Sequence, residues 1–332
     1  MYQQHFGLRR ALFESPIAGD GNVFLSGRLS AILENMEIAS TTRDSALVLF
    51  GSAGLGKTTV AAHALRSAGT RLAIGWLASA PPTGPELLEL LLGEFGVDVR
   101  GQSRAERLQS WRQYLRELGA TDTRAFVAVE NAQQLPVPVL QALDSLTRPD
   151  PNGGPGANLV LMGSSALCTL LEEPALAHLE QRIRLRQRFL PFEAAETAAY
   201  LVHEVMTAGG NYDAVFRPGA AAAVHAYAAG VPRVINNLCE TALAVAARRK
   251  APAVTAELVS ATAIELCGLQ PLAAAKAAAG DAEDERDPLD GLEVVEMLES
   301  EDTGNIPTLT ESVEIDIDSG AYALIVNGDT RG

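Results

Sequence analysis

The sequence has few cysteines, few aromatic residues and no long apolar run. Cys168, Cys239 and Cys267 stand far apart, and an odd number of cysteines without metal-ligand spacing argues against a disulfide framework and against a zinc site. No apolar run approaches the roughly 18 residues that span a membrane, and the first residues lack a basic and apolar leader. We therefore expect reduced thiols, and a protein that stays in the cytoplasm or reaches the inner membrane only through a partner.

Basic residues are scarce as well, and the deficit is concentrated near the end of the chain. The formal net charge is −15, and residues 281–318 alone hold 15 acidic residues against one base, Arg286, which gives −14. The rest of the chain is nearly neutral, which argues against a strongly basic face for nucleic acid. We expect residues 269–332 to form a disordered acidic tail, because they are acidic and almost free of aromatics.

Two short patches in this tail resemble strands. Residues 313–318 alternate apolar and acidic side chains, and residues 321–326 are apolar. Such a segment can add to the sheet edge of a partner protein or bind a basic surface. The alternative, which we favour, is a solubilising tail in which the two patches are incidental.

The most informative stretch lies between Ala46 and Ala64. Five apolar residues, Ala46–Phe50, precede a glycine-rich loop with the spacing G-x-x-x-x-G-K-[ST], and a helix pattern follows. Glycines allow successive backbone amides to point at one anion, so we expect this loop to bind nucleotide phosphates rather than to be an ordinary turn. Lys57 would reach the β- and γ-phosphates, and the Thr58 hydroxyl would bind Mg²⁺. The predicted nucleotide-binding residues here are Gly51, Ser52, Ala53, Gly54, Leu55, Gly56, Lys57, Thr58 and Thr59.

Strand and helix patterns alternate through the first part of the chain. Apolar strand patterns cover 46–50, 72–77, 125–129, 158–162 and the region around 183–189, and helix patterns cover 26–38, 57–65, a segment starting near 83, 104–118, 136–146 and 166–171. This alternation predicts an α/β fold of the P-loop NTPase type, with a parallel sheet and helices on both faces. After Phe192 the patterns are all helical, over 193–207, 218–229, 231–249 and 255–266.

These patterns predict four parts of the chain. We expect an N-terminal lead-in and helix over 1–40, an ATPase core over 41–191, a small α-helical lid over 192–268 and the acidic tail over 269–332. The lead-in carries Tyr2, Phe6, Leu8, Leu12 and Phe13. These side chains either pack at the nucleotide base or cap the edge of the domain, and we favour the second alternative.

Several sequence blocks resemble the ExeA-like (general secretion pathway protein A) branch of the AAA+ ATPases over about residues 1–266. They are Tyr2 with His5-Phe6-Gly7-Leu8, the loop 51–58, Ala132-Gln133-Gln134-Leu135, Gln181-Arg182-Ile183, the block 196–201 and the block 230–239. The resemblance implies an ATP-binding and ATP-hydrolysing protein that uses Mg²⁺ and forms homo-oligomers. It also implies that Arg233 is a lid arginine that contacts the phosphates, and that Arg182 is a candidate arginine finger reaching into a neighbouring subunit. Arg182 could instead be a solvent-facing arginine like Arg184, Arg186 and Arg188.

The sequence departs from this family at the end of the third strand. ATPases of this type place Asp-Glu there, and this chain has Glu130-Asn131. Glu130 can still serve Mg²⁺, but Asn131 cannot accept a proton from water, and general-base help is worth about 10²–10⁴-fold. Three alternatives follow: a slow ATPase, a nucleotide switch with almost no turnover, or Glu130 acting as the base.

A second departure follows the fourth strand, where relatives have Gly-Gln-Pro and this chain has Gly163-Ser164-Ser165. A hydroxyl here, represented by Ser164, would contact the γ-phosphate, or a serine would simply cap the next helix.

Two functional classes fit the sequence. In the first, the chain is an ATP-driven motor or switch that binds a protein partner and helps to assemble a cell-envelope machine for secretion, pilus formation or polysaccharide export. In the second, it is a DNA-associated ATPase of the transposition or replication-loader type, which the near-neutral body disfavours.

Overall fold

The computed structural model describes residues 2–13, 23–42, 44–67, 71–78, 81, 83–98, 100–150 and 153–272. The chain divides into two units, Met1–Glu283 and Asp284–Gly332, and all described residues belong to the first. The tail predicted from residue 269 lies outside the described residues from residue 273 onward, including both strand-like patches. Its disorder and its binding roles therefore stay predictions.

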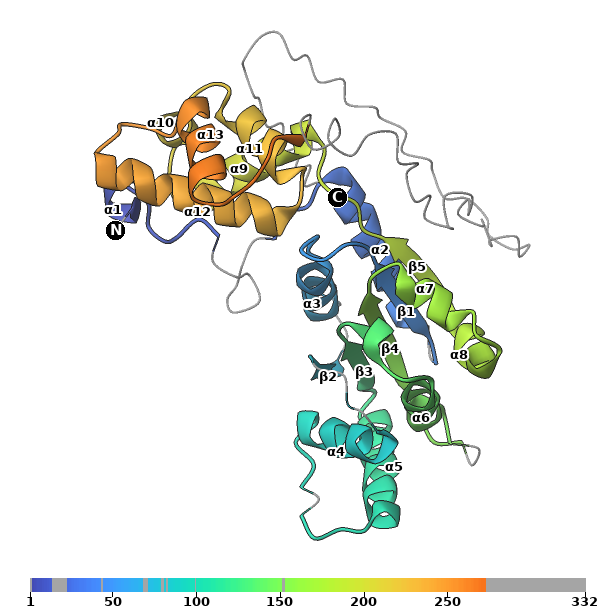
Figure 1. The fold of residues 1–332 in the computed structure, drawn as a ribbon. Helices are drawn as coiled ribbons and strands as arrows, with labels where there is room; N and C mark the ends of the chain where they lie inside the picture. The colour runs from blue at the N-terminus through green and yellow to red at the C-terminus, as the bar shows by residue number, and fades with distance from the viewer. Residues whose placement is uncertain are drawn as a thin grey trace, which may run out of the picture. The chain divides into compact units, whose positions relative to one another are not determined.

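A parallel sheet of five strands forms the centre of the α/β part (Figure 1). The strands are β1 (Ala46–Phe50), β2 (Leu72–Leu77), β3 (Arg124–Val129), β4 (Ala157–Gly163) and β5 (Ile183–Arg188), in the order β2-β3-β4-β1-β5. Every residue of β1 and β4 is buried, which explains why both strands are apolar apart from Asn158. Because all pairings are parallel, the carboxyl ends of the strands meet at one edge.

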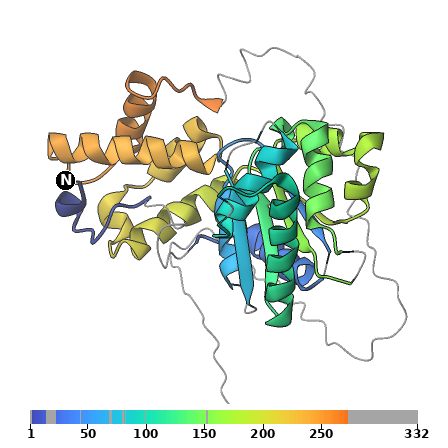
Figure 2. The ribbon, with the colours of Figure 1, turned by 90° about the horizontal axis from the view of Figure 1, so that it is seen from below.

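Helices cover both faces of this sheet, as the sequence predicts. On one face α2 (Gly27–Thr41) and α3 (Lys57–Ser67) bury Ile32, Met36, Val60 and Leu65 against the strands. The helices α4 (Gly84–Glu94), α5 (Arg104–Ala120) and α6 (Val137–Thr147) contact β2, β3 and β4, and Figure 2 shows the cyan-to-green helices and the blue helices on opposite sides of the strands. The short helices α7 (Ala166–Leu171) and α8 (Ala177–Glu180) lead to β5. The expected α/β P-loop fold is confirmed.

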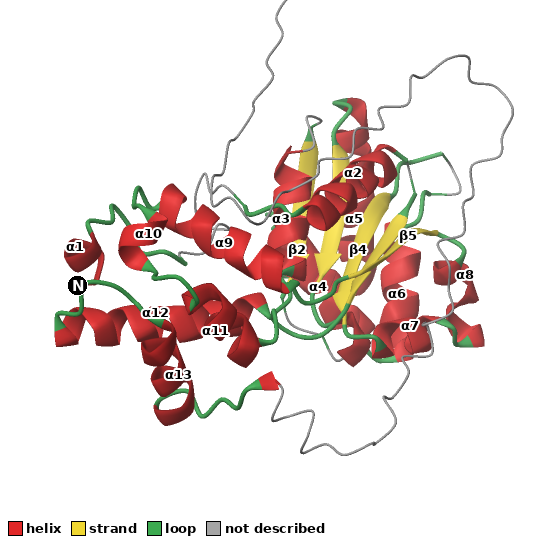
Figure 3. Cartoon of the chain, turned by 90° about the horizontal axis from the view of Figure 1, so that it is seen from above, coloured by secondary structure: helices red, strands yellow, loops and turns green. Residues whose placement is uncertain are grey.

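After β5 the described chain is helical up to residue 265 apart from its connections (Figure 3). It contains α9 (Ala194–Thr207), α10 (Tyr212–Val215), α11 (Ala220–Ala228), α12 (Pro232–Arg249) and α13 (Ala256–Glu265). Their apolar faces share one core, and the N-terminal segment with α1 (Tyr2–Phe6) contributes Leu8 and Leu12 to it. No helix of the described residues is long and apolar enough to cross a membrane.

Candidate functional site

The predicted phosphate loop lies at the carboxyl end of β1, between that strand and α3. Gly51 has a φ of +143°, and a Cβ atom there would lie 2.5 Å from the Phe189 carbonyl oxygen, so only glycine fits. Gly54 and Gly56 also have positive φ values, +84° and +86°, and the chain enters α3 directly at Lys57. The loop therefore has the backbone that turns amides toward an anion at a helix N-terminus.

Lys57 is folded back over this loop. Its Nζ donates hydrogen bonds to the carbonyl oxygens of Gly51, at 2.7 Å, and of Ser52, at 2.8 Å. Burial and the positive charge of Arg233 lower the pKa of the Lys57 ammonium. Two cations therefore lie close enough to repel each other at the glycine loop, and an anion between them would relieve that repulsion.

Arg233 lies in the first turn of α12 and is attached to the loop through its backbone. Its amide donates to the Gly54 carbonyl oxygen at 3.2 Å. The approach of α12 depends on Gly230, where a Cβ atom would lie 1.9 Å from the Phe192 carbonyl oxygen, and on Pro232, which suits the first helical turn. The residues that carried the family resemblance here thus place an arginine beside the phosphate loop.

A cavity of about 980 Å³ extends from the phosphate loop along the helical part of the chain. It brings together most of the predicted site residues: Ala53, Gly54, Leu55, Gly56, Lys57, Thr58, Thr59, Glu130, Asn131 and Arg233 all line it. Ser164 is not among its lining residues, although Met162 and Gly163 are. The Ser164 amide instead donates to Gln133 Oε1 at 3.3 Å, and Ser165 begins α7 without a side-chain capping bond.

Glu130 follows β3 and is held by a residue that the sequence reasoning missed. The indole Nε1 of Trp76, on the edge strand β2, donates to Glu130 Oε1 at 2.8 Å. Glu130 and Thr58 also both line a second cavity of about 490 Å³ that Trp76 helps to form. The two predicted Mg²⁺ ligands therefore line the same two cavities. Trp76 could have been identified in the sequence as an aromatic residue near the end of the strand beside β3.

Asn131 adopts a left-handed backbone conformation, with φ 50° and ψ 40°, at the start of a 3₁₀ turn over Ala132–Gln134. Asparagine tolerates this conformation better than most residues with a side chain. The backbone conformation therefore favours asparagine at position 131, and this residue also lines the large cavity.

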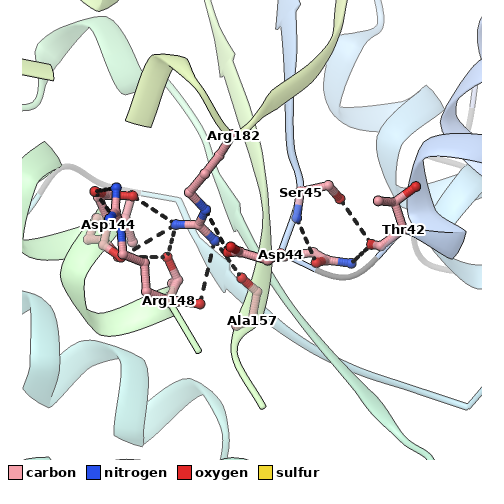
Figure 4. A network of polar contacts seen from close by, with 10 residues as sticks. Thr42, Asp44, Ser45, Asp144, Arg148, Ala157 and Arg182 are labelled. Atoms are coloured by element: carbon pink, nitrogen blue, oxygen red, sulfur yellow. Dashed lines mark hydrogen bonds and ion pairs between the residues drawn. The ribbon is translucent and has the colours of Figure 1, made fainter. Parts of the chain in front are cut away.

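The expectation that Arg182 reaches into a neighbouring subunit is wrong for this fold. Its side chain is 6% exposed and lies at the amino ends of the strands, where Ala46 N donates to the Arg182 carbonyl oxygen. Its guanidinium lies 2.8 Å from Asp44 and 2.9 Å from Asp144, and it donates to the Ala157 carbonyl oxygen at 3.1 Å (Figure 4). This is the edge of the sheet opposite the phosphate loop, so Arg182 ties strands and helices together.

The far end of the large cavity is formed by the N-terminal segment and α9. Arg10, Phe13, Phe24, Tyr200 and Glu204 line it, and the Tyr200 hydroxyl donates to Asn236 Oδ1 at 2.8 Å. The N-terminal segment therefore packs in the helical core, and Phe13 also lines the cavity. Contact of these side chains with a nucleotide base stays a prediction. Sequence reasoning did not identify Glu204, which lies in α9 one turn after Tyr200.

Comparisons with known proteins agree with this geometry. Residues 40–171 match a family model described as AAA domain. The chain is 29% identical over 274 residues to general secretion pathway protein A of Aeromonas hydrophila, an alignment that covers 81% of this chain and 49% of that protein. The chain thus spans about half the length of this curated relative.

Solved structures show the same fold at low identity. The ORC2 protein of Aeropyrum pernix superimposes with a TM-score of 0.61 at 16% identity, over 76% of this chain and 72% of that one. The ORC1 protein of Aeropyrum pernix, solved in complex with DNA, gives a TM-score of 0.58 at 20% identity, over 78% of this chain and 69% of that one. The chain therefore has the P-loop AAA+ fold and is similar in sequence to general secretion pathway protein A.

Proposed function

We propose that this chain binds ATP with Mg²⁺ and uses it as a slow ATPase or as a nucleotide switch. The observation that carries the proposal is the pairing of Lys57 with Arg233 at a glycine loop whose backbone suits an anion. Lys57 would turn from the Gly51 and Ser52 carbonyl oxygens to the β- and γ-phosphates. Arg233 would contact the same phosphates and hold the helical part closed over them.

Thr58 and Glu130 fit a Mg²⁺ site, because a hydroxyl and a carboxylate are oxygen donors on walls of the same two cavities. A Mg²⁺ ion held there would neutralise charge on the phosphates. Trp76 occupies one carboxylate oxygen of Glu130, and this fixed position suits metal binding better than proton abstraction. We therefore favour Glu130 as a metal ligand and not as the base.

Hydrolysis would then depend on Asn131, which can align a water molecule but cannot accept its proton. We expect slow turnover for this reason. Ser164 stays a proposed γ-phosphate contact, although it is not among the residues that line the cavity.

A paired experiment tests this function. ATP affinity with Mg²⁺ and ATP turnover are measured for the natural chain, for Lys57→Ala and for Asn131→Glu. We expect Lys57→Ala to abolish binding, and Asn131→Glu to bind as before and to turn over ATP at least tenfold faster. The proposal fails if the natural chain does not bind ATP at millimolar concentration. The assignment of Asn131 fails if the natural chain already turns over ATP rapidly and Asn131→Glu does not increase the rate.

The biological role that we propose is assistance to a cell-envelope machine through a protein partner, with the chain acting as a homo-oligomer in the cytoplasm. Its support is the relationship to general secretion pathway protein A, of which the chain spans about half. The likeness to a protein solved in complex with DNA shows the fold alone, at 20% identity. A salt-dependent retention of the chain on DNA would favour the DNA-associated alternative.

A further inference from the structure

We propose that Glu204 selects the nucleotide base, by accepting a hydrogen bond from the 6-amino group of adenine at the far end of the large cavity. This inference rests on the proposed function, because it takes the phosphate loop as the seat of the triphosphate.

The cavity runs away from the phosphate loop along one face of α12. Arg233, Asn236, Asn237 and Glu240 all line it, and the two asparagines lie three or four residues from both Arg233 and Glu240, which is one face of a helix. From Arg233 to Glu240 the helix rises by about 10 Å, at about 1.5 Å per residue. A nucleotide whose phosphates contact Arg233 would thus extend its base toward the level of Asn236 and Glu240.

The walls at this level suit a flat ring. Phe13, Phe24, Phe192 and Tyr200 all line the cavity. Their rings contact one another, with centroid separations of 5.4 Å for Phe24 and Tyr200, 5.6 Å for Phe24 and Phe192, and 6.0 Å for Phe13 and Tyr200. Aromatic side chains of this kind stack on nucleobases and favour them over smaller polar ligands.

Glu204 is the buried carboxylate among these rings. The residue is 9% exposed and lines the cavity. Within the part of the chain that the structure describes, its partner is Arg10, whose Nη2 lies 3.9 Å from Glu204 Oε2, beyond hydrogen-bond distance. A hydrogen-bond donor stabilises a buried carboxylate, so a ligand that supplies an N–H group would bind favourably at this position.

Asn236 adds a complementary group beside it. Its Oδ1 already accepts the Tyr200 hydroxyl, so its Nδ2 is the end that can donate to a ligand. An acceptor on Glu204 and a donor on Asn236 match the 6-amino group of adenine and an adjacent ring nitrogen.

The test compares ATP with purine riboside 5′-triphosphate, which lacks the 6-amino group and is otherwise the same. We expect the natural chain to bind ATP at least tenfold more tightly at pH 8, where the Glu204 carboxyl, with a pKa of about 7, is ionised. A tenfold difference in Kd corresponds to about 1.4 kcal/mol. Glu204→Leu removes the acceptor and should abolish this preference by weakening ATP alone. Glu204→Gln retains an acceptor oxygen and should keep part of the preference.

Glu265→Leu is the matched control, because Glu265 is exposed at the end of α13 and does not line this cavity. It should leave the preference unchanged. The inference is overturned if the natural chain binds the two nucleotides equally, if it binds GTP more tightly than ATP, or if Glu204→Leu weakens both nucleotides alike. If neither nucleotide binds to the natural chain, the proposed function itself has failed.

Discussion

The backbone amide of Arg233 donates a hydrogen bond to the carbonyl oxygen of Gly54, with 3.2 Å between the two atoms. This bond joins the first turn of α12 to the phosphate loop, although the two segments are far apart in sequence. The conformation of the loop and the position of the arginine therefore depend on each other. A substitution at residue 54 should therefore alter both the conformation of the loop and the position of Arg233.

Gly54→Ala should destabilise the chain more than Gly56→Ala. The two glycines have nearly equal φ values, +84° and +86°, so alanine costs a similar backbone strain at either position. They differ in their surroundings: a Cβ atom at residue 54 would lie 2.9 Å from Arg233 Cβ, and one at residue 56 would have nothing within 4 Å. We expect an extra loss of about 1–2 kcal/mol for Gly54→Ala, measured by urea unfolding without nucleotide. Equal losses would contradict the contact with Arg233.

Trp76→Phe should change how the site uses Mg²⁺. The substitution removes the indole N–H that donates to Glu130 at 2.8 Å and keeps an aromatic ring in the second cavity. A lost hydrogen bond of about 1 kcal/mol corresponds to about a fivefold change. We therefore expect the Mg²⁺ concentration for half-maximal ATP binding to rise by about that factor.

Trp111→Phe is the matched control for this experiment. Trp111 is fully buried and donates to the Leu146 carbonyl oxygen at 2.7 Å, away from Glu130. It should lower stability without shifting the Mg²⁺ dependence. If Trp76→Phe leaves the Mg²⁺ dependence where it is, Trp76 does not position Glu130.

Arg182→Met should lower the free energy of unfolding by about 3 kcal/mol, because it removes the buried cation that lies 2.9 Å from the Asp144 carboxylate. The partly exposed Arg148, at 2.8 Å from Asp144, would remain as its ion-pair partner. Arg184→Met, at an exposed position of the same strand, should change it by less than about 0.5 kcal/mol. ATP affinity of the folded protein should not change in either variant. A loss of ATP turnover in Arg182→Met at full stability would restore the arginine-finger assignment.

The sequence allowed the elements to be located well where a local pattern was strong. The strands β1 and β2 and the helix α7 have the predicted bounds, because short apolar runs are flanked by turn residues or caps. The helices α1, α8 and α10 were missed, since each has only four or five residues and shows no helical period. The strand order was not predicted either, because it depends on pairings between distant segments.

The site residues could likewise be predicted where a local motif is present and were missed where none is present. The phosphate loop and Arg233 carry local spacing that a motif can specify, and the structure places them together. Trp76 and Glu204 carry no motif, and their importance follows from contacts with Glu130 and with the cavity that only folding creates. Arg182 lies in a motif and was therefore expected to contact a neighbouring subunit, but its side chain is buried. A motif position does not predict burial.

The stability of the folded chain should depend on pH through the Glu204 carboxyl. Burial raises the pKa of the Glu204 carboxyl to about 7, and the charge of Arg10 opposes this shift only in part. In the unfolded chain the same carboxyl has a pKa of about 4.5. Between these pH values the folded chain holds a proton that the unfolded chain has released, so stability falls as the pH rises. The facing Tyr200 hydroxyl stays neutral here, because burial, chiefly, raises its pKa.

We therefore expect Glu204 to cost the nucleotide-free protein about 2–3 kcal/mol of stability between pH 5 and pH 8. Glu204→Gln cannot ionise and should not show this loss. Urea unfolding of both proteins at pH 5 and pH 8 gives the change in unfolding free energy for each. Subtracting the change in Glu204→Gln from that in the natural chain isolates Glu204, because the other carboxylates are common to both proteins. The natural chain should therefore lose more stability than Glu204→Gln on going to pH 8. A smaller loss in the natural chain would mean that Glu204 is ionised and stabilised in the folded state, since a carboxylate with a lowered pKa gains stability as the pH rises.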